Sequence, residues 1–579
     1  MSLSRREFMQ VLGAAAASGM LAPSGASAKV RSPDFKRMYE LPAYGNVSLL
    51  HFTDCHAQIN PVYFREPSIN VGVGVMRNRP PHLVGEAFLK HFHIPAKGRR
   101  SYAFTYLDFV SSAHRYGKIG GFAHLSTLIQ YMRDQRPSNS TLLLDGGDTW
   151  QGSPTALWTQ GQDMIDAQKL LGVDLMTGHW DFTYGAERVK EILAKDFKPH
   201  NIEFIAQNVV DNTWGDPIFK PYVMRELGGV RVAVIGQAFP YTPIANPAYF
   251  TPDWIFGIDE QRMQKTVDHA RTAGAQVVIL LSHNGMDVDL KMASRVRGID
   301  FILGGHTHDA VPAPVAVRNA GGQTFVANSG SNGKYLGVLD LDVRNGKISG
   351  HRFVLLPVFS DLIPADPKMA AHIQASRAPF EHKLGEHLAT ADDLLYRRGN
   401  FNGTFDQLIV EAMMQVQGAP IAFSPGFRWG TSVVPGEAIT MEDLMNQTAI
   451  TYPTATINYY TGAQIKAIME DVGDNLFNKD PYYQQGGDMI RTGGLKYTMD
   501  PSRNVGQRIT DLQLDNGTPL NPNKKYKVAG WASVQKIPVG RPIWEVVAEY
   551  LRHHKSIRIP EPYTPTLKGI SGNQGYART

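Results

Sequence analysis

Short apolar runs recur along the first half of the chain, and each ends in a small group of polar residues. Runs this short are typical of buried strands rather than helices. Segments with the apolar spacing of an amphipathic helix lie between them. The runs occupy residues 47–52, 141–144, 173–176, 276–281 and 299–303. Because strands and helices alternate, the sequence predicts a layered α/β domain in this region.

The polar residues that follow these runs include an aspartate or a histidine in every case. In sheets with helices on their faces, functional sites collect beyond the carboxyl ends of the strands. The five loops are therefore predicted to meet at one place. They carry Asp54 and His56, Asp148, His179, His283, and finally His306 and His308. Two glycines precede the last pair and let the backbone approach a ligand closely.

These seven side chains indicate a site for two divalent ions. Asp54 and His56 lie two positions apart, so on an extended segment both can face one ion. Asp148 is placed to bridge two ions. Aspartate and histidine without a thiolate suit manganese, zinc or iron, and two such ions hold a hydroxide and clamp a tetrahedral oxyanion group. A single histidine is more often structural, but the whole set favours a metal site.

Length, charge and the amino terminus limit the possibilities. A chain of 579 residues is too long for one core, so two domains are expected. The net charge of +5 comes with no basic stripe, which argues against nucleic acid as a partner. Residues 1–28 carry twin arginines, a short apolar stretch and a small-residue cleavage site, which predicts a twin-arginine signal peptide and a periplasmic protein. A membrane anchor would need about 20 apolar residues, so none is expected.

Composition and motif spacing predict four segments. They are a signal peptide (1–28), a dimetal domain (29–360), a linker helix (361–390) and a second domain (391–579). Within the dimetal domain, residues 29–46 are predicted to form an extended arm. Residues 60–116, which are rich in aromatics, are predicted to form an irregular insertion.

The ordered motifs resemble those of the binuclear metallophosphoesterases, in particular the 5′-nucleotidase branch with its C-terminal substrate domain. The matching motifs lie at 54–56, 147–148, 283 and 305–308, and in the second domain at 402–408 and 424–428. The resemblance covers most of the mature chain. It implies a four-layer sandwich of two mixed sheets flanked by helices, followed by a C-terminal α/β domain. It also implies that the seven aspartates and histidines are the metal ligands.

One motif departs from that family. Where the family has Gly-Asn-His-Glu-Phe-Asp, this chain has Gly-His-Trp-Asp-Phe-Thr. His179 replaces an asparagine ligand, whereas Trp180 and Thr183 replace the catalytic histidine and the aspartate that orients it. Together with the twin-arginine segment and residues 486–491, this motif resembles the SoxB family of sulfate-releasing hydrolases. The resemblance implies two manganese ions, with zinc as an alternative, and a cysteine S-thiosulfonate on the SoxYZ carrier protein as the substrate.

The departure fits the chemistry of that substrate. A phosphate ester expels an alkoxide, which needs a proton from a group such as histidine. An S-sulfonate expels a sulfur anion, and because a thiol has a pKa of roughly 8.5, no acid is required. We therefore expect a metal-bridging hydroxide, held by Asp148, to attack the terminal sulfonate sulfur and release sulfate during thiosulfate oxidation.

Substrate contacts are expected from the second domain. Arg428 matches the substrate arginine of the nucleotidase motif and would grip a sulfonate oxygen; a surface ion pair is the alternative. Arg491 and Asp488 are further candidates for binding the substrate. The glycine-rich segment 484–488 is expected to line one side of a narrow channel for a carrier peptide.

Four further features are interpreted, three of them in two ways. Trp180 is expected to wall the site, or to pack in a core. Asp181 is expected to support the ligands by hydrogen bonds, as is Asn284 unless it is a turn residue. The insertion 60–116 is either a docking surface for the carrier or a stabilising flap.

The sequence thus predicts a periplasmic, monomeric dimetal hydrolase. Two alternatives stay open. One is a nucleotidase or phosphodiesterase, which would release phosphate from nucleotides. The other is a metal-stabilised binding module for a carrier protein, which would show no turnover even with metal present.

Overall fold

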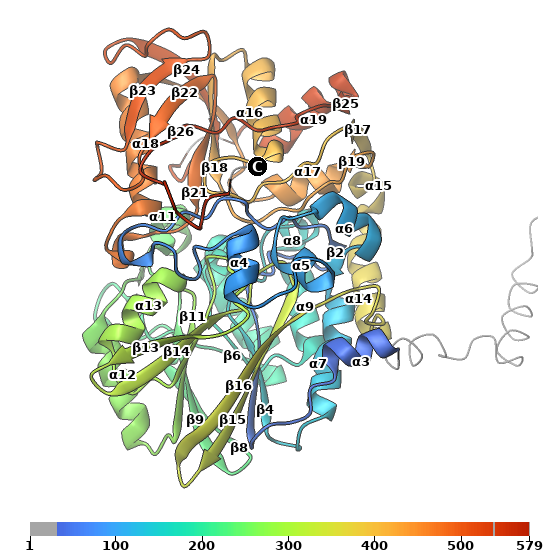
Figure 1. Ribbon diagram of the computed structural model, residues 1–579, viewed down its shortest axis with the longest axis vertical. Helices are drawn as coiled ribbons and strands as arrows, with labels where there is room; N and C mark the ends of the chain where they lie inside the picture. Colours follow the sequence, from blue (N-terminus) through green and yellow to red (C-terminus); the bar gives the residue numbers. More distant parts are fainter. Residues whose placement is uncertain (1–31, 537–538, 578–579) are drawn as a thin grey trace, which may run out of the picture.

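The protein has two lobes stacked along its long axis (Figure 1). The computed structural model describes residues 32–536 and 539–577, so the predicted signal peptide 1–28 lies outside the described residues. The first lobe contains the strands from β1 to β16, and the second lobe contains the elements from β17 onward. Within the described residues, no helix combines the length and the apolar character needed to cross a bilayer.

Two six-stranded sheets form the centre of the first lobe. Parallel and antiparallel neighbours occur in both, so both sheets are mixed. The first sheet has the order β16 (Lys347–Pro357), β15 (Tyr335–Arg344), β1 (Val47–Phe52), β4 (Thr141–Asp145), β5 (Leu175–Met176), β6 (Glu203–Phe204). The second has the order β13 (Val315–Asn319), β14 (Gly322–Asn328), β12 (Phe301–Gly304), β11 (Val277–Ser282), β9 (Val230–Gln237), β8 (Tyr222–Leu227).

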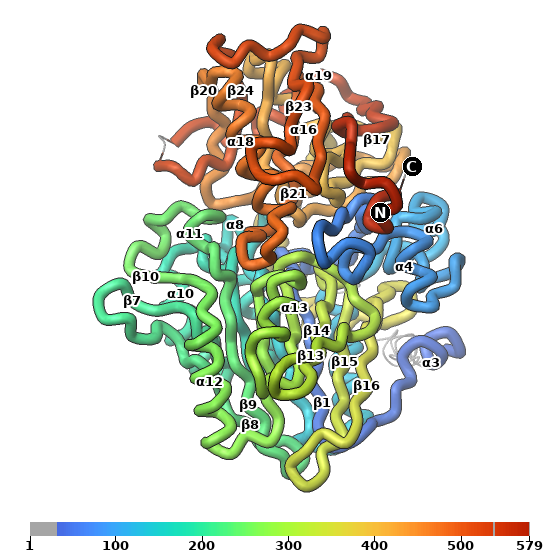
Figure 2. Tube along the Cα trace, turned by 60° about the vertical axis from the view of Figure 1, so that its left-hand side comes forward, coloured from blue at the N-terminus to red at the C-terminus, as the bar shows by residue number. Residues whose placement is uncertain are grey.

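Side chains from the facing sides of the two sheets form one apolar core, which includes Leu49, Leu144, Val232 and Leu281. Helices α7 (Phe122–Asp134) and α9 (Gln162–Leu171) pack on the outer face of the first sheet. Helices α12 (Glu260–Thr272) and α13 (Met286–Arg295) cover the outer face of the second (Figure 2). The predicted four-layer α/β sandwich is therefore confirmed.

The second lobe is built on a four-stranded sheet with the order β20 (Ala455–Thr461), β24 (Lys525–Trp531), β18 (Ile421–Gly426), β21 (Asp488–Gly493). Helices α16 (Thr404–Gln417) and α19 (Ile543–His554) pack on one face, and α18 (Gly462–Phe477) packs on the other. Two small sheets complete the lobe: β19 (Ala438–Thr440), β17 (His387–Ala391), β25 (Ser556–Ile557), and β23 (Ile509–Leu514), β22 (Leu495–Met499), β26 (Thr566–Leu567). This is the expected second α/β unit.

Three segments differ from the predictions. The arm at 29–46 contains helix α3 (Pro33–Tyr39), which Ser32 caps at its N-terminus. The insertion at 60–116 contains α4 (Gly85–His91), α5 (Arg99–Phe104) and α6 (Phe109–Tyr116), each with aromatic residues buried in the first lobe. The expected linker helix ends early: α14 (Pro367–Arg377) and α15 (Glu381–Leu384) are followed by strand β17.

The C-terminal segment of the chain is bound to the insertion. The backbone N–H of Asn70 donates to Gly575 (2.7 Å), that of Val84 donates to Gln574 (3.1 Å), and the Asn573 amide donates to the carbonyl of Gly72 (2.9 Å). Arg99 of the insertion forms a bidentate ion pair with Asp361 (2.6 and 2.8 Å) and a cation–π contact with the ring of Phe359. These contacts favour the stabilising role of the insertion.

Candidate metal centre

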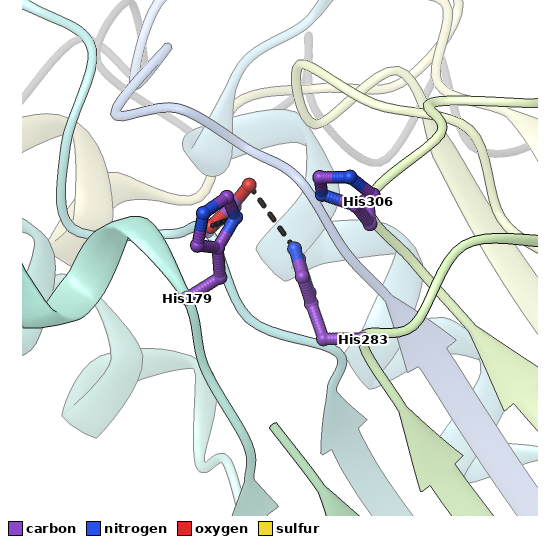
Figure 3. Close-up of side chains that lie close together, drawn as sticks. His179, His283 and His306 are labelled. Carbon is purple, nitrogen blue, oxygen red and sulfur yellow. Dashed lines mark ion pairs between the residues drawn. The ribbon is translucent and has the colours of Figure 1, made fainter. Parts of the chain in front are cut away.

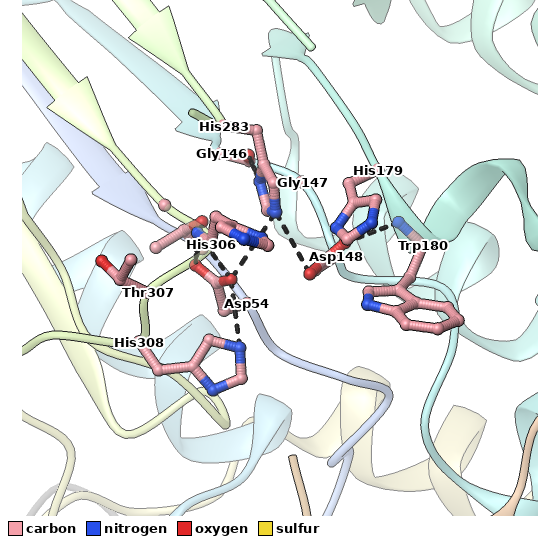
Figure 4. Close-up of polar contacts among 12 residues, drawn as sticks. Asp54, Gly146, Gly147, Asp148, His179, Trp180, His283, His306, Thr307 and His308 are labelled. Atoms are coloured by element: carbon pink, nitrogen blue, oxygen red, sulfur yellow. Dashed lines mark hydrogen bonds and ion pairs between the residues drawn. The ribbon is translucent and has the colours of Figure 1, made fainter. Parts of the chain in front are cut away.

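All seven predicted ligands lie in loops that follow strands, and all seven are buried. The loops after β1, β4 and β5 leave the first sheet, and those after β11 and β12 leave the second. Since the carboxyl ends of these parallel strands face one edge, the five loops meet there as predicted (Figure 4).

The seven side chains form two groups of four that share Asp148. In each group the ligand atoms lie within 4.8 Å of one another: Asp148, His179, His283 and His306 form one, and Asp54, His56, Asp148 and His308 form the other. Figure 3 shows the three imidazoles of the first group around a common space. Oδ2 of Asp148 lies 3.1 Å from His283 Nε2 and 3.4 Å from His56 Nε2, so one oxygen faces both groups.

The backbone at these loops is held in an unusual conformation. Five of the seven ligand candidates have φ between 44° and 74°, a region that non-glycine residues enter rarely. Hydrogen bonds between the loops enforce it: His56 N–H donates to the carbonyl of Asp148 (2.7 Å), and His306 N–H donates to Oδ1 of Asp54 (2.8 Å). Such conformations cost about 1–3 kcal/mol each and cluster at functional sites.

Hydrogen bonds to carbonyl oxygens assign the ring protons of three histidines. A carbonyl only accepts, so the nitrogen facing it must be the N–H. Nδ1 of His56 therefore donates to Gln151 (3.2 Å), Nδ1 of His283 to Gly146 (2.6 Å), and Nε2 of His306 to Gln485 (3.3 Å). In each ring the other nitrogen faces the site and can offer a lone pair to metal, which in His283 requires the loss of a proton first.

The surroundings of these ring nitrogens favour a bound cation. Nδ1 of His306 and both ring nitrogens of His179 are buried and have no hydrogen-bond partner among the described residues. Nε2 of His56 faces Nε2 of His308 at 3.0 Å, with Asp148 and Asp54 beside them. The nitrogen and carboxylate donors fit divalent ions such as manganese or zinc. The site is therefore suited to hold divalent metal.

Burial and mutual charge shift the pKa values of the ligands in opposite directions. Burial lowers the pKa of His56 to about 4 although Asp148 opposes the change. Burial would lower the pKa of His283 as well, but Asp148 and Asp54 raise it to about 10. Burial would raise the pKa of Asp148, yet His283 and His179 hold it well below its usual range. The shared carboxylate is thus an anion at the centre of the site.

Asp181 holds the loop of the shared ligand in place. Its carboxylate accepts hydrogen bonds from the backbone N–H groups of Asp148 (2.9 Å), Thr149 (3.1 Å) and Trp150 (3.0 Å). Asn284 bonds to Gln237 and Asp289, each at 3.0 Å, and so supports the neighbouring His283 loop from behind.

A cavity of about 190 Å³ opens onto the ligands between the two lobes. Trp180 forms part of its wall and stacks edge-on against Trp429 of the second lobe (ring centroids 4.8 Å apart). Arg428 lines the cavity, as do residues 485–487 of the glycine-rich segment. The structure thus places Trp180 both at the site and in the core between the lobes.

Arg491 and Asp488, which were expected to bind the substrate, are not among the residues that line this cavity. Arg491 is fully buried and pairs with Asp406 (3.0 Å) and Asp488 (3.2 Å). Asp488 in turn accepts a hydrogen bond from Nε of Arg428 (3.4 Å). The two residues lie behind the cavity wall and hold Arg428.

The aromatic wall residues that the sequence did not reveal include Phe239 and Trp429. The ring of Phe239 lies 4.0 Å from that of His306, and the ring of Trp429 lies 5.2 Å from that of His56 (centroid distances). Phe239 follows strand β9, so the strand-end pattern could have identified it, but its loop carries no aspartate or histidine.

Comparisons with known proteins agree with this architecture. Residues 388–536 match the family described as 5′-nucleotidase, C-terminal domain. The structure is similar to that of the Thermus thermophilus sulfate thiohydrolase SoxB in complex with glycerol, with a TM-score of 0.86, 39% sequence identity, and coverage of 92% of this chain and 98% of that chain. The 5′-nucleotidase of Bos taurus is 26% identical over 457 residues, which cover 71% of this chain and 76% of that protein. A 5′-nucleotidase precursor, also from Thermus thermophilus, shares the fold (TM-score 0.71, 21% identity, 90% and 99% coverage).

Proposed function

This chain belongs to the SoxB family, a hydrolase family related to the 5′-nucleotidases, and on that basis we propose that it releases sulfate from a cysteine S-thiosulfonate on the SoxYZ carrier protein. The proposal includes two manganese ions at the ligands described above, with zinc as a second possibility. We also propose that the protein is monomeric, is exported by the twin-arginine route and acts in the periplasm.

The absence of an acid in the cavity wall is the observation that carries the proposal. Apart from the proposed metal ligands, the ionisable side chains among the described lining residues are Tyr241 and Arg428. The Tyr241 hydroxyl donates to the carbonyl of Tyr482, and burial raises the pKa of Tyr241 above its ordinary value. Neither side chain is a histidine or a carboxylic acid, so beyond the metal ligands the described wall offers no general acid of the usual kind, and we expect the leaving group to depart as an anion. A sulfur anion does so readily, whereas an alkoxide does not.

The residues at the replaced catalytic positions are engaged elsewhere. The indole of Trp180 packs against Phe427 and Trp429, and the Thr183 hydroxyl bonds to that of Thr451 (2.7 Å). Both contacts join the two lobes. They leave no acid in the place where the related phosphoesterases are expected to hold one.

The size of the cavity also supports a small reacting group. Pockets for drug-sized molecules typically measure about 300–1,000 Å³, whereas this cavity measures about 190 Å³. It suits a thiosulfonate on a thin peptide better than a complete nucleotide. A nucleotidase or phosphodiesterase is the second candidate, because of the 5′-nucleotidase relatives.

The chain's own residues would bind and orient the substrate. When bound, the two divalent ions would supply an activated water and Lewis acidity. Asp148 would hold both ions through one carboxylate. Nη1 of Arg428 is buried without a partner among the described residues, and it would donate to a sulfonate oxygen. The aromatic wall formed by Trp180, Phe427 and Trp429 would exclude bulk water from the reacting group.

Competing substrates test the proposal directly. The purified, manganese-loaded protein is given the thiosulfonate-loaded carrier or adenosine monophosphate, and the sulfate and phosphate released are measured. We expect sulfate release alone. Faster phosphate release would favour the nucleotidase, and no turnover of either substrate would favour a binding module without catalysis.

A further inference from the structure

We infer that the second lobe completes the metal site of the first lobe by fixing the ring orientation of His306 through Gln485 and Gly486. This inference rests on the metal assignment and not on the identity of the substrate. It assigns a positioning role to a loop that sequence analysis expected only to line a channel.

The first observation is the source of the carbonyl that accepts from His306. The carbonyls that accept from His56 and His283 belong to Gln151 and Gly146, which lie in the first lobe. The carbonyl that accepts from Nε2 of His306 belongs to Gln485 in the second lobe (3.3 Å). Metal-binding histidines usually donate their other ring N–H to such a partner, which sets the ligand nitrogen. For His306 the nitrogen left for metal is Nδ1, which is buried without a partner among the described residues.

The second observation is the close approach of Gly486 to the same ring. Gly486 has φ +78°, and a Cβ atom there would lie 2.0 Å from Nε2 of His306. Real atoms do not approach so closely, so any side chain at this position must displace the imidazole or the loop. Glycine is needed for the loop to reach the ligand.

The loop is also attached to the first lobe on its other side. Lys291 forms an ion pair with Asp480 (2.5 Å), and the Tyr241 hydroxyl donates to the carbonyl of Tyr482. Residues 480–486 therefore contact the first lobe at several points, the last of which is His306. Because residues 485–487 also line the cavity, a substrate that displaces this loop would disturb a metal ligand. Docking of the lobes and metal occupancy are coupled in this arrangement.

Neighbouring glycines provide a matched pair of variants. Gly487 has φ +74°, so Gly486→Ala and Gly487→Ala carry the same backbone strain, but a Cβ at 487 meets nothing closer than 3.6 Å. We expect Gly486→Ala to bind one of its two ions about 10–100-fold more weakly, the usual effect of losing an outer contact to a ligand. Gly487→Ala should keep the metal affinity of the unmutated protein. The readout is manganese affinity in competition with a chelator, because both glycines line the cavity and activity would not separate them.

A measurement on the unmutated protein covers the case in which Gly486→Ala does not fold. With zinc bound, ¹⁵N spectra of the histidine rings should show His306 with zinc at Nδ1 and a proton at Nε2. Zinc at Nε2, or equal affinities in the two variants, would overturn the inference. If the unmutated protein bound no divalent metal, the metal assignment itself would fail instead.

Discussion

A buried carboxylate behind the cavity offers the most quantitative test of the structure. Asp488 is 3% exposed and lies among three guanidinium groups: Arg491 (3.2 Å), Arg428 (3.4 Å) and Arg398 (3.9 Å). Burial would raise the pKa of Asp488, but these arginines hold it below its usual range. We predict that Asp488→Asn, which keeps the shape and removes the charge, destabilises the second lobe.

The expected loss of stability depends on which contacts the arginines keep after the substitution. Removing one partner of a buried ion pair costs about 3–5 kcal/mol. Arg491 keeps its contact with Asp406, so the lower end of that range applies. For a lobe of this size, each kcal/mol shifts the unfolding midpoint by about 2–4 °C, so the expected decrease is about 6–12 °C. Because the pKa of Asp488 is depressed in the folded protein, its charge stabilises the lobe above pH of about 4, and this stabilisation is lost as the pH falls below that value.

Calorimetric unfolding of two variants checks this prediction. The control is Asp34→Asn, which removes an exposed pair with Arg37 and should cost less than about 1 kcal/mol. Sulfate release by Asp488→Asn should show a raised KM with unchanged metal content, because Arg428 loses its support. Equal unfolding temperatures for the two variants would refute the argument that buried charge pairing behind the cavity stabilises this lobe.

Three further predictions concern the metal site. Asp148→Ala should lose both ions and all activity, whereas His179→Ala should lose one ion; equal loss in elemental analysis would contradict the shared role of Asp148. Metal affinity of the metal-free protein should rise with pH, because His283, with a pKa of about 10, must release its proton to bind. Calorimetry in buffers of different ionisation enthalpy counts that proton, and a pH-independent affinity would disprove the assignment. Trp180→His combined with Thr183→Asp should reduce sulfate release and introduce weak phosphoesterase activity; efficient nucleotide hydrolysis by the unmutated protein would contradict this expectation.

The metal centre could be predicted because each ligand follows a strand that can be recognised from its own short apolar run. Residues 47–52 and 299–303 are largely apolar, and the aspartates and histidines come directly after such runs. The edge at which parallel strands end then brings distant loops together without any knowledge of side-chain contacts.

The rest depended on contacts between distant segments. Arg428 and Arg491 are both arginines of the second lobe, and only the folded structure places Arg428 in the cavity lining and Arg491 behind it, where Arg491 pairs with Asp406 and Asp488. The helices of the insertion are six to eight residues long, too short for a helical period to be evident in the sequence. The contact of Gln485 with His306 arises only when the two lobes dock.

The bond between Asn573 and Gly72 spans 501 positions of the chain. During synthesis the insertion can therefore form this bond only after residue 573 has been added to the chain. Loop closure over such a separation is slow compared with the local pairing inside either lobe. The first lobe can assemble its sheets early, but its surface near residues 68–84 remains open until the C-terminal segment arrives. Sensitivity to proteolysis at this surface should thus report whether the segment around residues 573–575 has docked onto the insertion.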